Sequence, residues 1–141
     1  MTSDTPCPCG SGDSFGACCG RFLSGDTAAP TAVQLMRSRY TAYALGTLEY
    51  VYDTWHPSTR PSRVELDVGA DGDAAEGTGT APLRWLHLAI ESHEAGGPFD
   101  DEGTVTFRAT ARGPEGRVVL HERSRFARED GAWLYVDGEQ F

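Results

Sequence analysis

All four cysteines of the chain lie within one short stretch, CPCGSGDSFGACCG, at residues 7–20. One residue separates the first two cysteines, eight residues follow, and the last two are adjacent. This spacing brings two pairs of thiols together across one small loop, and four thiolates match the closed tetrahedral coordination of structural zinc. The stretch therefore predicts a zinc knuckle that holds one structural Zn²⁺ ion. Its four predicted ligands are Cys7, Cys9, Cys18 and Cys19.

Other uses of the four thiols are less well supported by the sequence. The N-terminal residues show no export signal, so we expect a cytoplasmic protein, in which thiols stay reduced and disulfides are rare. A redox site of the Cys-x-x-Cys type is not present in the stretch. Inert thiols and a soft ion such as copper(I) remain as alternatives. A site closed by four thiolates has no open coordination position and would be structural, not catalytic.

Length and charge narrow the class of protein. A chain of 141 residues has the size of one compact domain with a small appendage. No stretch approaches the roughly 20 apolar residues of a membrane helix, so we expect no membrane contact. The net charge is −9, and all 12 basic side chains are arginine. Because an acidic surface repels phosphate, general nucleic-acid binding is not expected unless the arginines cluster on one face.

Two helices are predicted in the first half of the chain. The stretch at 30–46 has a capping box at Thr31 and Gln34 and a left-handed stop at Gly46. A second helix is predicted to begin at Thr47 and to end before Pro57. One apolar face of the first helix is expected to pack on a sheet. That face comprises Val33, Met36, Tyr40, Tyr43 and Ala44.

The second half of the chain changes period. Residues 67–82 are acidic and Gly-rich, which predicts a mobile loop. The four segments that follow, beginning at residues 84, 102, 116 and 131, alternate apolar and polar residues between Gly, Pro and Asp turns. They predict four antiparallel strands, so the fold class is α+β, with helices packed on a sheet.

Several motifs resemble known families. CPCGSG followed by CCG resembles the SEC-C motif, a zinc-binding element also found at the C-terminus of the SecA translocation ATPase. LMRSRYTAY, DTWHP, ERSRFARE and YVDG resemble the YchJ-like proteins, which join a SEC-C element to an NTF2-like domain. The resemblance implies an NTF2-like (cystatin-like) cone, in which helices pack on a curved sheet around a cavity. It implies a SEC-C-like knuckle at residues 1–25 and an NTF2-like domain at residues 26–141. It implies no established activity.

One constellation of possible pocket residues follows from the strand periods. In the third strand, Glu122 shares a largely apolar face with Leu120 and Phe126. A buried carboxylate needs a partner, and we favour Arg37 over Arg39 on the first helix. The expected role is a buried ion pair that docks helix on sheet; a ligand-binding pair is the alternative. The complete set of pocket candidates is Arg37, Tyr40, Trp55, His56, Glu122, Trp133 and Tyr135.

Two classes of function remain after these considerations. The first is a non-enzymatic module whose knuckle docks on a partner protein and whose cone binds a small molecule or peptide. The second is an enzyme of the isomerase or dehydratase type that acts on a small polar substrate in the cone. Soft-metal handling is a weaker third class. Because the closed cysteine site is the clearest chemical motif, we favour the first class.

The alternation of the last strand predicts that Trp133, Tyr135 and Asp137 lie on one face.

Overall fold

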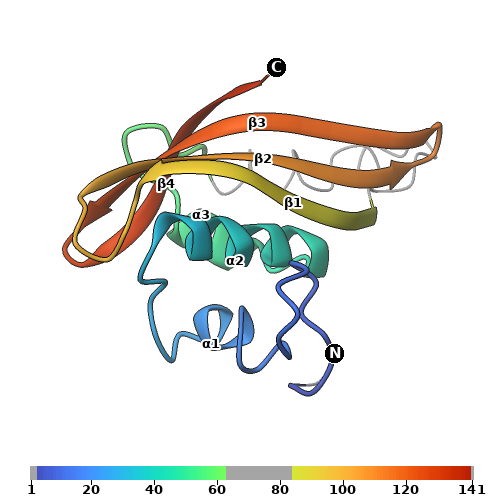
Figure 1. Ribbon diagram of the computed structural model, residues 1–141, viewed down its shortest axis with the longest axis horizontal. Helices are drawn as coiled ribbons and strands as arrows, with labels where there is room; N and C mark the ends of the chain where they lie inside the picture. The colour runs from blue at the N-terminus through green and yellow to red at the C-terminus, as the bar shows by residue number, and fades with distance from the viewer. Residues whose placement is uncertain (1–2, 63–83, 141) are drawn as a thin grey trace.

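The computed structural model describes residues 3–62 and 84–140, so the acidic loop predicted at 67–82 lies outside the described residues. Three helices precede a four-stranded sheet (Figure 1). The helices are α1 (Gly20–Leu23), α2 (Ala32–Leu45) and α3 (Leu48–Asp53). The strands are β1 (Arg84–Ala95), β2 (Glu102–Gly113), β3 (Gly116–Glu129) and β4 (Ala132–Gln140). Both predicted helices and all four predicted strands are confirmed.

The sheet is an antiparallel meander in the order β1-β2-β3-β4. Tight turns join its later strands: Asp130 and Gly131, which connect β3 to β4, have φ angles of 52° and 81°. Two positive φ angles in a two-residue turn match the right-handed twist of a hairpin. The inner face of β2 is buried at Val105, Phe107 and Ala109. This strand alternates as its sequence predicts, because one face meets the helices and the other meets solvent.

Strand β4 departs from simple alternation. Arg125 pairs with Asp137, but its neighbour Phe126 pairs with Tyr135, so Val136 is an extra residue opposite β3. Such a bulge turns the following residues to the other face of the sheet. The expectation that Trp133, Tyr135 and Asp137 share one face is therefore wrong for Asp137, whose carboxylate pairs with the outward-facing Arg125.

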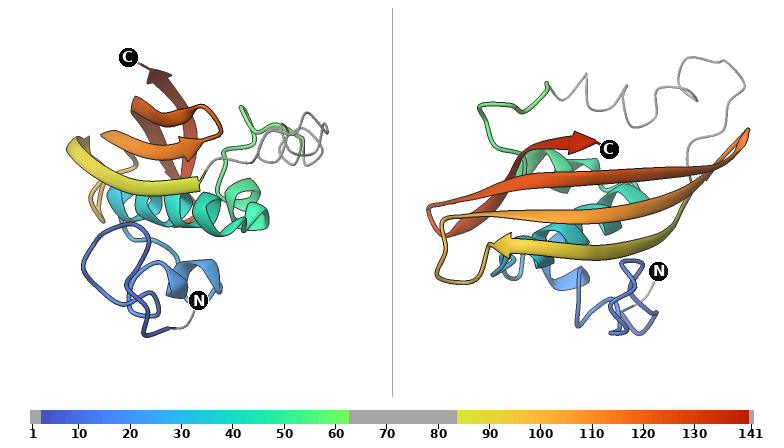
Figure 2. Two further views of the ribbon diagram at one scale, coloured as in Figure 1. Left: turned by 90° about the vertical axis from the view of Figure 1, so that its right-hand side faces the viewer. Right: turned by 45° about the horizontal axis from the view of Figure 1, so that its top comes forward.

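Helix α2 forms the centre of the molecule. Thr31 caps its start by accepting a hydrogen bond from the Gln34 N–H at 3.2 Å, and Gly46 ends it with a φ of 76°. The sheet curves over one side of α2, and the N-terminal segment with α1 lies on the other side (Figures 1 and 2). The single apolar face predicted for this helix is therefore incomplete, because Leu35, Ser38 and Thr41 are buried as well.

One hydrophobic cluster runs through all three layers. It joins the four cysteines and Phe22 to Leu35 and Met36 of α2, and continues to Phe107 and Phe126 of the sheet. The division at residue 25 into two domains stays a prediction, since the two parts share this core. No helix in the described part of the chain is long and apolar enough to cross a membrane.

Candidate metal centre and adjoining cavity

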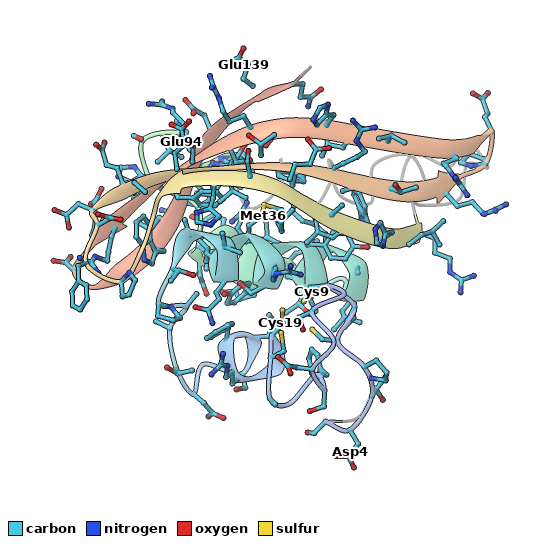
Figure 3. The ribbon with its side chains drawn as sticks, in the orientation of Figure 1. Asp4, Cys9, Cys19, Met36, Glu94 and Glu139 are labelled. Carbon is cyan, nitrogen blue, oxygen red and sulfur yellow. The ribbon has the colours of Figure 1, made fainter. Side chains whose placement is uncertain are left out.

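The N-terminal loop brings its two cysteine pairs together by local backbone hydrogen bonds. The Cys7 N–H donates to the Asp13 carbonyl at 3.0 Å, and Pro6 and Ser14 form an isolated antiparallel β-bridge. Gly10 has a φ of 78°, a conformation that suits glycine, and allows the loop to reverse direction between the pairs. Cys19 is the residue before α1, so the second pair is carried by a helix start. Figure 3 shows Cys9 and Cys19 between α1 and α2.

The four sulfurs lie close enough together to ligate one metal ion. Their Sγ atoms all lie within 4.8 Å of one another. The Cys9 and Cys18 sulfurs are 3.7 Å apart, and those of Cys18 and Cys19 are 3.9 Å apart. A tetrahedral site with metal–sulfur bonds of about 2.3 Å separates its sulfurs by about 3.8 Å. Disulfide sulfurs would be about 2.05 Å apart. The donor set therefore fits a metal ion and not a disulfide pair.

Hydrogen bonding favours negative charge on Cys9 within this cluster, whereas burial opposes negative charge on Cys18. Cys9 and Cys19 are 0% exposed, and Cys7 and Cys18 are also buried. Hydrogen bonds from the Cys19 and Cys7 thiols lower the pKa of Cys9, whereas burial raises the pKa of Cys18. Because the four thiols share protons with one another, a cation that displaces those protons gains several sulfur ligands at once.

Polar groups around the cluster come from the loop and from α2. The Ser11 hydroxyl lies 3.1 Å from the Cys18 sulfur, and the Thr41 hydroxyl of α2 lies 3.8 Å from the Cys7 sulfur. Arg37 of α2 donates from Nη1 to the Cys9 carbonyl at 2.9 Å. These contacts attach the knuckle to the central helix and orient its ligands.

The contact of Arg37 corrects the predicted pairing with Glu122. Residues 37 and 39 are two positions apart on a helix and point in directions about 200° apart. Arg37 is directed to the knuckle, and Arg39 is directed to the sheet, where it lines a cavity with Glu122. The predicted pairing of Arg37 with Glu122 is therefore wrong, because the knuckle covers a second side of α2 and Arg37 contacts it.

The cavity lies between α2, Trp55 in the segment after α3, and the inner face of the sheet, and has a volume of about 170 Å³. Most of its wall is aromatic or aliphatic, and its charged side chains are Arg39 and Glu122. The lining residues are Met36, Arg39, Tyr40, Tyr43, Trp55, Trp85, Phe107, Ala109, Leu120, Glu122, Ser124 and Tyr135. Figure 3 shows Met36 on the side of α2 away from Cys9 and Cys19. The cavity and the metal centre therefore occupy opposite sides of one helix.

Arg39 is held firmly at the wall of this cavity. Its Nη1 donates to the Val51 carbonyl at 2.9 Å and to the Thr54 hydroxyl at 2.8 Å. Its guanidinium carbon lies 5.1 Å from the ring centre of Trp55 and 4.6 Å from that of Tyr135, within cation–π range. Burial lowers the pKa of Arg39. The cation is thus fixed by α3 and by two aromatic rings.

Glu122 lies on the opposite wall, on β3. Its Oε2 accepts a hydrogen bond from the Ser124 hydroxyl at 2.5 Å. The carboxylate lies directly over Gly138 of β4, where an added Cβ would be 2.2 Å from Oε2. Gly138 reaches the inner face because of the bulge at Val136. The glycine of the YVDG sequence therefore provides the space that the Glu122 carboxylate occupies.

Tyrosine hydroxyls supply the remaining polar groups of the cavity. Burial raises the pKa of Tyr40 to about 12 and also raises the pKa of Tyr43 and of Tyr135. Such hydroxyls remain protonated near neutral pH and can donate hydrogen bonds.

Four of the seven pocket candidates line the cavity, namely Tyr40, Trp55, Glu122 and Tyr135. Arg37 lies at the knuckle. Trp133 is directed away from the cavity, where its indole N–H donates to the Pro30 carbonyl at 3.0 Å. Arg39, Tyr43 and Trp85 also line the cavity but are not among the predicted pocket residues. Arg39 and Tyr43 are one helical turn apart, a spacing from which they could have been identified as neighbours.

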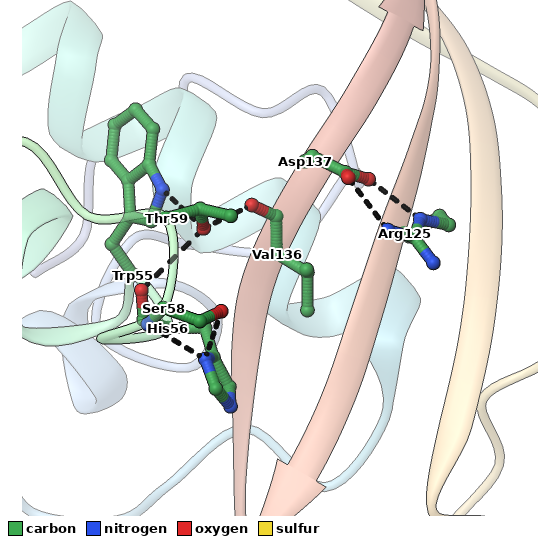
Figure 4. Close-up of polar contacts among 7 residues, drawn as sticks. All are labelled: Trp55, His56, Ser58, Thr59, Arg125, Val136 and Asp137. Atoms are coloured by element: carbon green, nitrogen blue, oxygen red, sulfur yellow. Dashed lines mark hydrogen bonds and ion pairs between the residues drawn. The ribbon is translucent and has the colours of Figure 1, made fainter.

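His56 also lies outside the cavity, in a surface network (Figure 4). The Ser58 N–H and hydroxyl both approach His56 Nδ1, at 3.1 Å and 2.8 Å, and Nε2 contacts the Glu129 carboxylate. Nδ1 is thus an acceptor, which places the ring proton on Nε2. Ser58, His56 and the Glu129 carboxylate are in contact, as in a catalytic triad. The Ser58 hydroxyl, however, is used in a local turn with His56, two residues before it. We assign this network to anchoring the loop after α3, whose His56 N–H also donates to the Tyr135 carbonyl at 2.7 Å.

Comparison with known families agrees with the fold and with the cysteine cluster. A family model of the SEC-C motif matches residues 5–21, so the class of protein is a SEC-C motif joined to an NTF2-like domain. The model described as "YchJ, middle NTF2-like domain" matches residues 31–138. The chain belongs to the YchJ-like family, whose relatives carry the name UPF0225 protein. The resemblance drawn from the sequence motifs is therefore confirmed.

Relatives and solved structures cover almost the whole chain. A UPF0225 protein of Streptomyces coelicolor is 51% identical over 95% of this chain and 94% of its own length. One of Chromobacterium violaceum is 48% identical over 94% of this chain and 90% of its own length. The solution structure of a SEC-C motif containing protein from Rhodopseudomonas palustris has a TM-score of 0.75 and 32% identity, and covers 96% of this chain and 98% of that chain. A crystal structure from Psychrobacter arcticus, at 24% identity and a TM-score of 0.70, shares the fold over 96% of this chain and 82% of that chain. A partner protein at the knuckle stays a prediction.

Proposed function

We propose that this protein is a non-enzymatic binding module in which one structural Zn²⁺ ion, held by the four cysteines, supports a ligand-binding NTF2-like domain. The observation that carries the proposal is the closed cluster of four buried thiols, all within 4.8 Å of one another. Four thiolates complete a tetrahedral site and leave no position for a substrate. Ligand binding is accordingly assigned to the cavity on the other side of α2.

Zinc suits this donor set better than the alternatives. Four thiolates in a tetrahedron are the ligands and geometry of structural zinc, while copper(I) prefers fewer thiolate ligands. The contacts of Thr41 and Arg37 also tie the site into the core, as expected for a metal that stays in place. An ion that is delivered to another protein needs a more accessible site than one built from buried sulfurs.

Binding is favoured over catalysis by the groups that line the cavity. General acid–base catalysis works best with a pKa near the operating pH. The pKa of Tyr40 is raised to about 12, so this hydroxyl is suited to donating a hydrogen bond and not to transferring a proton at neutral pH. His56, one of the predicted pocket residues, lies outside the cavity. Glu122 is held by Ser124 and faces Arg39, an arrangement suited to fixing a polar ligand.

Native mass spectrometry of protein purified without added metal tests the zinc assignment. We expect one zinc ion per chain and four thiols that react with an alkylating reagent only after unfolding. Two disulfides, or four reactive thiols without metal in the folded protein, would overturn the assignment. One copper ion in place of zinc would instead support soft-metal handling.

A further inference from the structure

The cavity contains two opposite charges that do not meet. Arg39 is 4% exposed and Glu122 is 8% exposed, so both are largely removed from water. Within the described part of the chain, Arg39 donates to Val51 and Thr54 and lies beside the Tyr43 side chain, and Glu122 accepts from Ser124; no direct ion pair joins Arg39 to Glu122. Buried charges are costly unless each has a partner of opposite charge or several hydrogen bonds. The space between them is therefore a site for complementary charges.

The arginine is prepared to bind an anion. The two N–H groups on Nη1 are already used by Val51 and Thr54. An arginine has five N–H groups, so those on Nε and Nη2 remain for the Tyr43 side chain beside them and for a ligand. Two parallel N–H donors recognise a carboxylate in a bidentate manner. Stacking against Trp55 and Tyr135 fixes the plane of the guanidinium before any ligand arrives.

The carboxylate on the opposite wall is prepared to bind a cation. Ser124 holds Oε2 of Glu122, and Gly138 leaves room for the carboxylate against β4. The rings of Tyr40 and Trp85, whose centres are 5.8 Å apart, line the same cavity. Ammonium groups are attracted both to carboxylates and to the faces of aromatic rings. The cavity thus offers both a carboxylate and aromatic rings to a positive group.

The size of the cavity limits the ligand. Its volume is about 170 Å³, and a cavity of about 150 Å³ holds one benzene molecule. Because the two wall charges cancel, a ligand of either net charge would leave one wall charge unmatched. Building on the proposed ligand-binding function, we propose that the cavity binds a small zwitterion of about ring size, an amino acid or a betaine, with its carboxylate on Arg39 and its ammonium group on Glu122.

Three ring-sized probes test this proposal against isotope-labelled, metal-loaded full-length protein. Proline has both charges, prolinamide keeps only the cation, and pyroglutamate keeps only the anion; glycine betaine is a second zwitterion. Binding is followed by NMR at the indole N–H groups of Trp55 and Trp85, which line the cavity. The indole of Trp133, which is bonded to Pro30, is the internal control.

We expect proline or glycine betaine at millimolar concentration to shift the Trp55 and Trp85 signals and to leave Trp133 unchanged. Prolinamide and pyroglutamate should bind at least about tenfold more weakly than proline, because each loses one charged hydrogen bond. Equal binding by either single-charge analogue would overturn the zwitterion proposal and leave a ligand-binding cavity standing. No shift of either cavity indole with any of the four compounds would overturn both the zwitterion proposal and ligand binding in the cavity.

The variant Glu122→Gln should lose the preference for proline over pyroglutamate, a change that a purely structural role of Glu122 would not produce. It keeps the shape of the side chain and removes its charge. The preference of the wild-type protein for proline over pyroglutamate should then disappear, because the amide no longer attracts the ammonium group or repels the second anion. Glu139→Gln makes the same change at an exposed carboxylate paired with Arg123 and should keep the wild-type preference. An unchanged preference in Glu122→Gln, with the Trp133 signal unmoved, would contradict the proposal.

Discussion

The metal centre and the cavity lie on opposite sides of helix α2 and differ in how they treat their polar groups. At the metal centre, the four sulfurs lie within 4.8 Å of one another, the Ser11 hydroxyl lies 3.1 Å from the Cys18 sulfur, and Arg37 donates to the Cys9 carbonyl at 2.9 Å. In the cavity, Arg39 and Glu122 are buried but stay apart. Polar groups that contact one another stabilise the folded structure, whereas charged groups that stay apart can still form hydrogen bonds with a ligand. In the proposed function, the helix carries a structural site on one side and a ligand-binding site on the other.

The largest expected effect of any single substitution is at the metal centre. Cys9→Ser removes a proposed metal ligand that is 0% exposed and belongs to the continuous core. We expect loss of the bound metal and a fall of about 10 °C or more in the midpoint of thermal unfolding, because loss of a structural metal ranks among the costliest changes. Circular dichroism and metal analysis by mass spectrometry measure both. Ser11→Ala, which keeps all four ligands, should retain the metal. A Cys9→Ser protein with full metal content would contradict the assigned ligand set.

The second test compares two arginines on α2. Arg39→Ala leaves a void and removes the donor to Val51 and Thr54, so we expect a loss of about 3 kcal/mol in the free energy of unfolding. Arg37→Ala removes one hydrogen bond to the half-buried surface of the knuckle and should cost about 1 kcal/mol. Urea unfolding of both variants measures the difference. The reverse order of stabilities would show that the assignment of the two arginines to opposite sides is wrong.

A smaller effect is expected at Gly138. Gly138→Ala places a methyl group where the Glu122 carboxylate lies, 2.2 Å from Oε2 before any adjustment. Because the clash is with the end of a flexible side chain, we expect a cost of about 1–2 kcal/mol. In a Glu122→Ala background the same substitution should be nearly neutral, so a double-mutant cycle isolates the contact. An equal cost in both backgrounds would mean that Gly138 is needed for another reason.

The smallest effect is expected from alkaline pH. Burial raises the pKa of Tyr40 from its ordinary value of 10.0 to about 12. The unfolded chain therefore loses this proton at a lower pH than the folded protein, so the contribution to stability is constant below about pH 10 and declines as pH rises toward about 12. Tyr40→Phe should show a shallower decline in urea unfolding over this range. The decline persists in part, because the pKa values of Tyr43 and Tyr135 are raised as well. Identical pH profiles for variant and wild type would contradict the assigned shift.

Local signals in the sequence were sufficient for most of the fold. Thr31 and Gly46 mark the ends of α2 because capping depends on neighbouring residues alone. The four cysteines were recognised as a cluster from their spacing, which a short loop converts directly into proximity. The four strands followed from alternation and turn residues for the same reason.

Features that depend on packing between distant segments could not be predicted in this way. A strand predicted from strict alternation contains no extra residue. The bulge at Val136, which turns Asp137 outward and Gly138 inward, could therefore not be predicted from the alternation of β4. The choice of Arg39 over Arg37 required knowledge that the knuckle covers the second side of α2. The helical period gives the angle between Arg37 and Arg39 but not the direction in which either side chain points, so it cannot decide which of the two lines the cavity.

The burial of α2 on two sides also bears on the order in which the protein assembles during synthesis. The knuckle precedes α2 directly in the chain, whereas the sheet that covers the other side begins at residue 84. The ribosome therefore releases the cysteines and the helix well before it releases the strands. A metal ion captured by the emerging thiols would give α2 its first packing partner, and the four strands, each paired with its neighbour in sequence, would then close over a helix that is already oriented.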